Sequence, residues 1–180
     1  IQVEYVSANP TGPLHVGHGR GAAVGSALAN LMKAAGMNVS REYYINDAGN
    51  QINNLAASVN ARYLEQLGQT VEFPENGYHG HDIIETAERI VRIYGDRFLN
   101  MSEEERLKEF RTIALKEKLA ALKEDLEAFN VTYDEWFSEQ TLHDANAIKN
   151  ACDLLTERGY LYEEGGALWL KATEYGDDKD

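Results

Sequence analysis

Cysteine and long apolar runs are both scarce in this sequence. Cys152 is the only cysteine among 180 residues, so the chain has no disulfide framework and no cysteine metal cluster. No apolar stretch approaches the roughly 20 residues that span a bilayer. Glu4 and Asn9 interrupt any apolar core that a secretory signal would need. Neither an internal repeat nor a low-complexity tract is present. We therefore expect a protein of the reducing cytoplasm that has no membrane partner.

Positive charge is also scarce. The chain carries 17 Lys and Arg against 30 Asp and Glu, a formal net charge of −13, which argues against strong polyanion binding by this chain alone. Its length accommodates one domain, or one domain with a sizeable insertion. The chain starts without Met inside an expected strand and ends on a charged run. We therefore expect it to be a fragment of a larger protein, whose other parts carry any basic surface.

The most informative segment present is the opening motif, residues 7–21. An expected strand, residues 1–6, leads into a turn rich in Pro and Gly. An expected helix, residues 15–35, follows, with apolar positions at helical spacing: Val24, Leu28, Leu31 and Met32. The first turn of a helix has unpaired N–H groups and the positive end of the helix dipole, so it attracts anions. His15 and His18 are three residues apart and lie on one face of that turn. The motif therefore predicts a site for a phosphate chain.

The residue types of this motif suit nucleotidyl transfer. Gly17 has no Cβ, so a flat ring or a sugar can approach the backbone between the two histidines. Two imidazole donors that point at one spot can stabilise charge that develops on an α-phosphate, and such transfers depend mainly on positioning and electrostatics. The alternative is that His15 and His18 are only polar caps of a glycine-rich strand–helix turn.

The remaining pattern predicts an α/β chain. Residues 39–45 have the β-branched and aromatic character of a second strand, which a βαβ connection makes parallel to the first. A helix follows to about residue 67, with Asp47 as its expected cap. Beyond a loop, two helices are expected to form an antiparallel hairpin. The first has apolar positions at helical spacing from Ile83 to Phe98, and the second begins with a capping box of Ser102 and Glu105. A third strand at 132–138, a helix at 142–158 and a β-hairpin around Gly165 and Gly166 complete the chain.

Several single residues leave two interpretations open. Glu4, just before the turn, either faces solvent or is buried against a guanidinium partner. Asp47 either caps its helix or, with Gln51, reaches a ligand at the strand ends.

His79 and His81 beside Asp82 form an incomplete and poorly spaced set for zinc, so we favour a docking loop over a metal site. Trp136 and Trp169 are interpreted as core residues and not as base-stacking platforms. The charged side chains of the second hairpin helix are interpreted as a solvated face, on which neighbouring glutamates largely cancel the positive charges. A tRNA-contact role stays open for its basic residues: Lys108, Arg111, Lys116, Lys118 and Lys123.

Several segments together resemble class I aminoacyl-tRNA synthetases. The run EYVSANPTGPLHVGH, residues 4–18, is similar to the His-Ile-Gly-His region of that class. Its particular residues resemble the bacterial type of arginyl-tRNA synthetase. Further similar segments are REYYINDAGNQI at 41–52, YHG at 78–80, WFSE at 136–139, GALWL at 166–170 and GDDKD at 176–180. The resemblance extends over the whole chain.

The resemblance implies a fold and a reaction. The implied fold is the first half of a class I Rossmann-like nucleotide-binding domain, an α/β fold. Residues 1–67 would form its first βαβ part, 68–130 a helical insertion, and 131–180 a return to the catalytic domain with a helix and a β-hairpin, while the anticodon-binding domain is absent. The implied reaction is ATP-dependent activation of L-arginine, with release of pyrophosphate, and attachment of the arginine to tRNA-Arg.

The resemblance also implies residue roles. His15, Gly17 and His18 would bind ATP, the two histidines being catalytic through the α-phosphate, and Asn9 would sit between ATP and the amino acid. Glu4, Ser7 and Asn9 would contribute to the arginine site. ATP would bring its own Mg²⁺, and no metal bound by protein ligands is expected.

Two departures from the family bear on activity. Gly12 stands where some arginyl enzymes carry a lysine associated with loss of the later Lys-Met-Ser-Lys loop, which implies that the full-length protein keeps that loop. The loop and the strand that carries the family's Tyr and Asp arginine ligands are missing, so we expect no arginyl-adenylate from the isolated chain. Two other functions stay open: a nucleotidyltransferase of the same superfamily that acts on a small acid or alcohol, and a non-catalytic synthetase-derived binding module.

Overall fold

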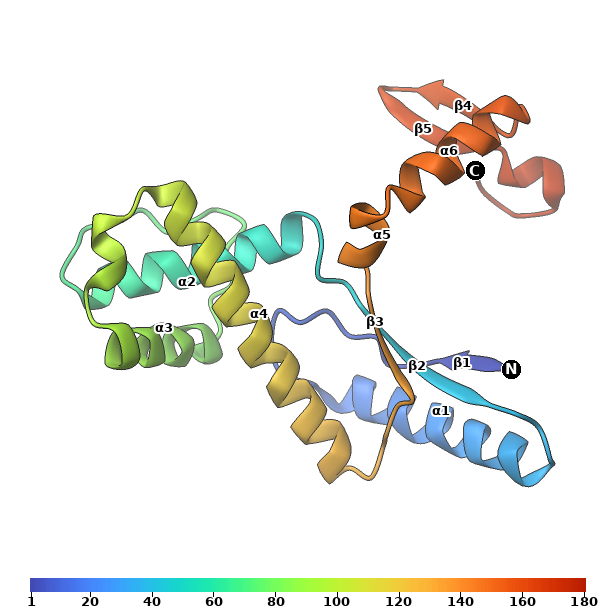
Figure 1. Ribbon diagram of the computed structural model, residues 1–180, viewed down its shortest axis with the longest axis horizontal. Coiled ribbons are helices and arrows are strands. Elements are labelled where there is room, and N and C mark those ends of the chain that lie inside the picture. The colour runs from blue at the N-terminus through green and yellow to red at the C-terminus, as the bar shows by residue number, and fades with distance from the viewer. The chain divides into compact units, whose positions relative to one another are not determined.

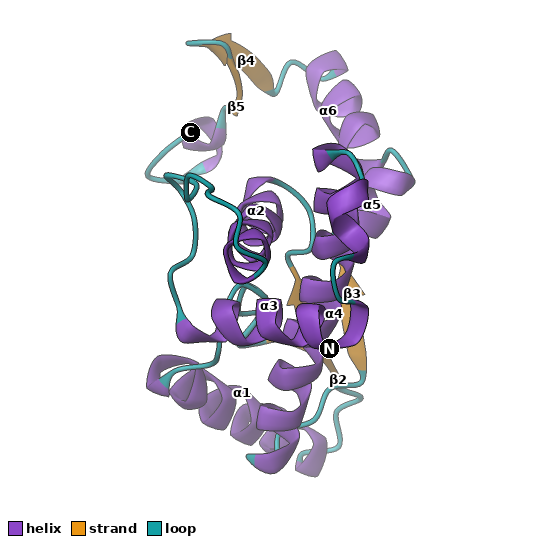
Figure 2. Ribbon diagram, turned by 90° about the vertical axis from the view of Figure 1, so that its left-hand side faces the viewer, coloured by secondary structure: helices purple, strands orange, loops and turns teal.

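Helices and loops account for most of the chain, and its strands form two small sheets (Figures 1 and 2). The computed structural model describes residues 1–180, and its contacts divide them into two compact units, Ile1–Glu139 and Gln140–Asp180. No helix combines the length and the apolar content that a membrane crossing would require.

The first unit contains a three-stranded parallel sheet. Its strands are β1 (Gln2–Glu4), β2 (Ser40–Ile45) and β3 (Glu135–Ser138), arranged in the order β1-β2-β3. β1 pairs with β2 in parallel, and β2 pairs with β3 in parallel. The predicted βαβ start and the predicted return of the chain to the sheet are both confirmed. All three strands therefore end at the same edge of the sheet.

Helix α1 (Val16–Ala34) approaches the sheet through small residues. Its buried positions are Ala22, Gly25 and Ala29, and a Cβ placed on Gly25 would lie only 2.3 Å from Cγ of Tyr5. The large apolar residues that marked this helix in the sequence face outward, with Val24, Leu28 and Leu31 exposed by 64%, 45% and 69%. We call the buried cluster beneath α1 the sheet core; it consists of Tyr5, Ala22, Tyr43, Ile45, Leu126 and Val131.

A second cluster lies among the helices α2 (Asn50–Gln66), α3 (His81–Tyr94) and α4 (Glu103–Ala128). Both α3 and α4 pack on α2, which is therefore the centre of the group. We call this cluster the helical core; it consists of Leu55, Val59, Tyr63, Ile83, Ala87, Ile90, Phe98, Phe110 and Ala114. In Figure 1, α4 extends from this group toward α1, and its late residue Leu126 belongs to the sheet core.

The predicted helical hairpin needs two corrections. Gly95, with a φ of 60°, ends α3, so Phe98 lies in a separate short helix, η1 (Arg97–Asn100). The sequence also placed Lys118 on a solvated face of α4, whereas Lys118 is only 6% exposed. The predicted capping box of Ser102 and Glu105 is confirmed at the start of α4.

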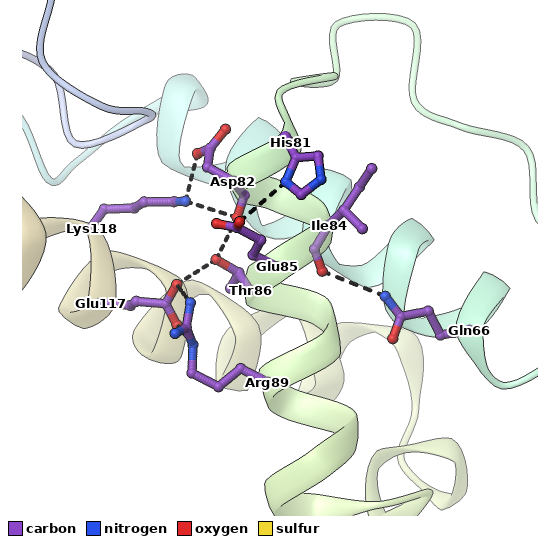
Figure 3. A network of polar contacts seen from close by, with 9 residues as sticks. All are labelled: Gln66, His81, Asp82, Ile84, Glu85, Thr86, Arg89, Glu117 and Lys118. Carbon is purple, nitrogen blue, oxygen red and sulfur yellow. Dashed lines mark hydrogen bonds and ion pairs between the residues drawn. The ribbon is translucent and has the colours of Figure 1, made fainter.

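Polar side chains connect α3 to α4 (Figure 3). Lys118 Nζ donates to Oδ2 of Asp82 at 2.5 Å and to its main-chain carbonyl at 3.1 Å. One turn further along α3, the Glu117 carboxylate accepts hydrogen bonds from Oγ1 of Thr86 at 2.6 Å and from the guanidinium of Arg89 at 2.9 and 3.0 Å. The buried lysine is therefore paired, as a buried charge must be.

The second unit is small and has no fully buried residue. It contains α5 (Gln140–Asp144), α6 (Ala147–Glu157), the antiparallel strands β4 (Leu161–Glu164) and β5 (Ala167–Leu170), and a short helix η2 (Ala172–Tyr175). The single helix predicted at 142–158 is wrong, because Asn146 adopts a left-handed conformation with a φ of 52° between α5 and α6. The predicted hairpin is confirmed, and both residues of its turn, Gly165 and Gly166, have the positive φ that this turn requires.

The two tryptophans differ in environment. Trp136 lies within the aromatic cluster of the sheet core, where its ring stacks on Tyr43 with a centroid distance of 4.3 Å. The core interpretation is therefore confirmed for Trp136. Trp169 is 41% exposed on the hairpin, so the same interpretation is wrong for it.

Candidate active site

The opening motif leaves the sheet through a strained turn. β1 ends at Glu4, and the next residues include Val6 and Ser7 with φ angles of 70° and 40°. Positive φ is uncommon for residues other than glycine, and such strain persists only where surrounding contacts hold it. Two contacts from β2 do so: the Tyr43 hydroxyl donates to the carbonyl of Ala8 at 2.9 Å, and the Tyr44 N–H donates to Oγ of Ser7 at 3.1 Å. The neighbouring strand thus fixes the turn.

The two histidines then form the start of α1. His15 is the N-cap, and its Nδ1 accepts a hydrogen bond from the Gly17 N–H at 3.1 Å. His18 Nδ1 in turn accepts from the His15 N–H at 3.2 Å, which makes a reciprocal capping box from two imidazoles. The two rings stack with their centroids 3.7 Å apart. The shared face expected from their spacing is present, and so is the capping role that was its alternative.

These hydrogen bonds determine where the imidazole protons are. A ring nitrogen that accepts a hydrogen bond carries no proton, so in each neutral ring the proton is on Nε2. Burial, and then the neighbouring His15, lower the pKa of His18 below its ordinary value and favour the neutral ring. Capping and donation therefore use different atoms: Nδ1 faces the backbone, and Nε2–H remains as a donor for an anion at the helix start.

Gly17 lies against the folded-back ring of His15. A Cβ at this position would lie 2.9 Å from Cε1 of His15. The missing Cβ therefore leaves room for the N-cap ring. The contact between Gly17 and a nucleotide stays a prediction.

A pocket of about 260 Å³ adjoins the helix start. Leu14, His15 and Gly19 line it from the motif, and Asp125, Leu126 and Phe129 line it from the end of α4. The last turns of α4 therefore border the catalytic candidate His15.

A group of acidic residues occupies the edge at which the parallel strands end. Burial raises the pKa of the Tyr44 phenol, and the charges of Glu139, Asp47 and Glu4 raise it further. Tyr44 also makes a hydrogen bond with the Glu139 side chain. Ligands of open α/β sheets gather at this edge, and the charges of three carboxylates act on one phenol there. We call Glu4, Asp47 and Glu139 the acidic edge.

The sequence interpretation found this edge only in part. Glu4 is exposed, which favours the solvent-facing alternative. Asp47 is not the cap of α2, because Gly49 is the N-cap and makes no side-chain hydrogen bond. Instead Asp47 is 9% exposed, and its Oδ2 accepts from Oγ of Ser138 at 2.6 Å. Glu139 was missed as a candidate, although its position directly after a predicted strand was a usable signal.

The other predicted residues are distributed over the same strand ends. Ser7 lies in the turn, where its Oγ accepts from the Tyr44 N–H, and Asn9 is exposed two residues later. The histidine loop is separate from them. His79 stacks against Phe73 at 4.5 Å, and His81 pairs with Glu85 at 3.2 Å. No three His, Cys, Asp or Glu residues are placed together to hold a metal ion.

Comparison with known proteins matches the whole chain to one family. The model described as "tRNA synthetases class I (R), catalytic domain" matches residues 1–179. An arginine–tRNA ligase of Carboxydothermus hydrogenoformans is 59% identical over 180 residues, and one of Listeria welshimeri is 57% identical; each match covers 100% of this chain and 32% of the relative. A crystal structure named as an arginyl-tRNA synthetase of Campylobacter jejuni has a TM-score of 0.82 and 37% identity, and covers 99% of this chain and 39% of that one. The chain thus spans about a third of the length of its curated relatives.

Proposed function

The chain belongs to the catalytic-domain family of the class I tRNA synthetases for arginine, and from this premise we propose that it supplies the ATP-binding half of an arginine–tRNA ligase. In the proposed reaction, the carboxylate of L-arginine attacks the α-phosphorus of ATP and pyrophosphate leaves. The arginyl group is then transferred to the 3′ end of tRNA-Arg. Mg²⁺ would enter with the phosphates of the nucleotide, and the reaction would take place in the cytoplasm.

The start of α1 is the proposed phosphate site. His15 and His18 would donate hydrogen bonds from Nε2–H to oxygens of the α-phosphate as negative charge builds up during the attack. Gly17 would contact the nucleotide beside the two histidines, and Asn9 would lie between the nucleotide and the amino acid. The observation that carries this proposal is the pair of Nδ1 hydrogen bonds at 3.1 and 3.2 Å, because they orient both remaining donors.

The acidic edge is the proposed site of the substrate guanidinium. A guanidinium is planar, permanently charged and suited to bidentate hydrogen bonds with carboxylates. Glu4 would supply such a carboxylate, and Ser7 and Asn9 would contribute polar contacts beside it. Burial raises the pKa of Tyr44, and the charges of Glu139, Asp47 and Glu4 raise it further; these charges support a negative potential at this position. The net charge of −13 further supports a small cationic substrate here and a tRNA held mainly by other regions.

A hybrid enzyme tests the proposal. We define the hybrid as the ligase of C. hydrogenoformans in which this chain replaces its matching 180 residues. We expect the hybrid to catalyse arginine-dependent exchange of pyrophosphate into ATP in the presence of tRNA-Arg. The isolated 180-residue chain should not catalyse it. A folded hybrid without exchange, or an isolated chain with exchange, would contradict this assignment.

Two substitutions at His15 separate capping from catalysis. In His15→Asn, the side-chain oxygen can replace Nδ1 as the cap acceptor, but no atom replaces Nε2. In His15→Gln, the amide can reach the Nε2 position, but the short cap is lost. We expect the Asn variant to keep its thermal midpoint and lose exchange activity by about 100-fold or more, whereas the Gln variant is less stable and more active than the Asn variant. Full activity in both variants would contradict the catalytic role of His15 and favour the alternative of a non-catalytic binding module.

A further inference from the structure

Arg111 connects the long helix to the acidic edge. It lies on α4 at the margin of the helical core, and its guanidinium donates to the main-chain carbonyl of Asp47 at 3.0 Å. Asp47 belongs to the turn after β2, 64 positions earlier in the chain. The contact therefore joins the helical group to the edge at which the parallel strands end.

The same turn is held from its other side by β3. Ser138, the last residue of β3, donates its hydroxyl to Oδ2 of Asp47 at 2.6 Å. Asp47 is 9% exposed, and a carboxylate this buried is stable only when it is hydrogen-bonded and close to positive charge. Ser138 provides a hydrogen bond to the carboxylate, and Arg111 brings a guanidinium to the same residue.

The position of Asp47 matters because it contributes to the field at the edge. Its charge acts on the Tyr44 phenol together with those of Glu139 and Glu4. If the turn after β2 moved, one of the three carboxylates would leave the arrangement, and the geometry offered to a substrate guanidinium would change.

We propose that Arg111 is a positioning residue for the arginine site, which holds the Asp47 turn and through it the acidic edge in the geometry that receives a guanidinium. This inference rests on the proposed function, because it concerns the same site. Arg111 itself does not touch the substrate; it acts through Asp47. The inference makes helix α4 part of substrate recognition as well as part of the helical core.

Arg106 is a matched control on the same helix. Its Nε donates to Oδ1 of Asn60 at 2.6 Å, and its Nη1 donates to the carbonyls of Met101 at 3.3 Å and Phe98 at 3.5 Å. Arg106 is also half-buried, but all its contacts lie within the helical group. Arg106→Ala therefore removes comparable hydrogen bonds from α4 and leaves the acidic edge intact.

The test is calorimetric titration of the hybrid enzyme with three ligands: L-arginine, ATP, and L-citrulline, which has arginine's shape with a neutral urea in place of the guanidinium. In Arg111→Ala we expect arginine affinity to fall by about tenfold or more, because the variant loses a hydrogen bond at a charged site. ATP affinity should stay within about twofold. Arg111→Lys, which keeps the charge with a single nitrogen donor, should recover part of the loss. Arg106→Ala should lower the thermal midpoint and leave both affinities within about twofold.

Contrary results are distinguishable. Unchanged arginine affinity in Arg111→Ala, or an equal loss for arginine and ATP, would overturn the role of Arg111 while the hybrid's preference for arginine over citrulline still supports the proposed function. An unsubstituted hybrid that binds citrulline as tightly as arginine would contradict the proposed function itself, and the role of Arg111 with it. Should Arg111→Ala not fold, Ser138→Ala removes the other support of Asp47: a selective loss of arginine affinity then supports the inference, and no loss overturns it.

Discussion

The sheet core and the helical core of the first unit use the same residue types in different ways. In the helical core, Tyr63, Phe98 and Phe110 pack edge to face with one another, and the single hydroxyl among them reaches the carbonyl of Gly95, which ends α3. In the sheet core, the Tyr43 hydroxyl reaches Ala8 and the Tyr133 hydroxyl reaches the carbonyl of Tyr5, both in the chain that leads to the opening motif. The helical core closes a helix group, whose helix α4 reaches the acidic edge through Arg111. The sheet core also holds the opening motif.

The two cores should therefore respond differently to substitution, because only the sheet core is hydrogen-bonded to the opening motif. A change in the helical core should cost stability and leave the geometry of the motif unaltered. A change of equal size in the sheet core should affect both, because its aromatic side chains are also hydrogen-bond donors to the motif's backbone. Four predictions test this division.

The largest expected effect on stability is in the helical core. Phe110 is fully buried and contacts Tyr63 and Phe98, so Phe110→Ala should lower the free energy of unfolding by about 3–5 kcal/mol. Urea denaturation of the 180-residue chain measures this. Exchange activity of the hybrid, assayed well below its melting temperature, should change little. A large loss of activity at that temperature would argue against the division.

The next effect tests the close approach of α1 to the sheet. A Cβ at Gly25 would overlap the Tyr5 ring at 2.3–2.6 Å, so Gly25→Ala should cost about 3 kcal/mol and also reduce activity, since Tyr5 precedes the motif. Gly21 lies on the same helix with nothing within 4 Å of an added Cβ. Gly21→Ala should therefore raise stability by up to about 1 kcal/mol. Equal effects of the two substitutions would show that helix propensity, and not packing, governs α1.

Alkaline pH should weaken the sheet core more than the helical core, in which burial also raises the pKa of Tyr63. Burial raises the pKa of Tyr43 to about 12, and burial also raises the pKa of Tyr133. When the pKa of a tyrosine is higher in the folded state than in the unfolded state, its neutral form stabilises the fold. This stabilisation is complete at a pH below the unfolded-state pKa, and it is lost as the pH rises to the folded-state pKa. Tyr43 should thus contribute about 2–3 kcal/mol below pH 10.0 that disappears by about pH 12. Denaturation curves of Tyr43→Phe across this range should show a shallower decline than those of the unsubstituted chain; a decline of unaltered slope would exclude Tyr43 as its source.

The smallest effect in free energy is the most informative about function. Tyr43→Phe and Tyr63→Phe each remove one hydroxyl that donates to a main-chain carbonyl at 2.9 Å. Each should cost about 1 kcal/mol of stability. In the hybrid, only Tyr43→Phe should reduce exchange activity, because only its hydroxyl holds the turn of the motif. Equal activity of the two variants would mean that Ser7 and Tyr44 alone suffice to fix that turn.

Local patterns predicted much of this structure. The βαβ start, the capping box at Ser102 and the Gly165–Gly166 hairpin all depend on neighbouring residues, and all three are present. Periodicity predicted α1 correctly but not the face that packs on the sheet. That choice depends on Tyr5, whose ring leaves room only for a glycine.

Long-range partners account for what the sequence did not reveal. Asp47 has the residue type and the chain position that are typical of a helix cap. In the structure it instead makes hydrogen bonds with Ser138 and Arg111, which lie 91 and 64 positions away in the chain. Lys118 is similarly a residue type that is typical of the surface, and only its ion pair with Asp82 in the folded chain explains its burial. Within the site, the shared face of His15 and His18 followed from their spacing, whereas the acidic edge required the third strand to be placed beside the second.

The capping arrangement of the two histidines limits what they can do chemically. Each ring has one lone pair, and that lone pair is committed to a backbone N–H. Neither ring can accept a proton without giving up the helix start, and a neutral imidazole is too weak an acid to hand over the proton on Nε2. The pair can stabilise negative charge but cannot relay protons, so any proton that moves in the proposed reaction must be carried by groups other than these two rings.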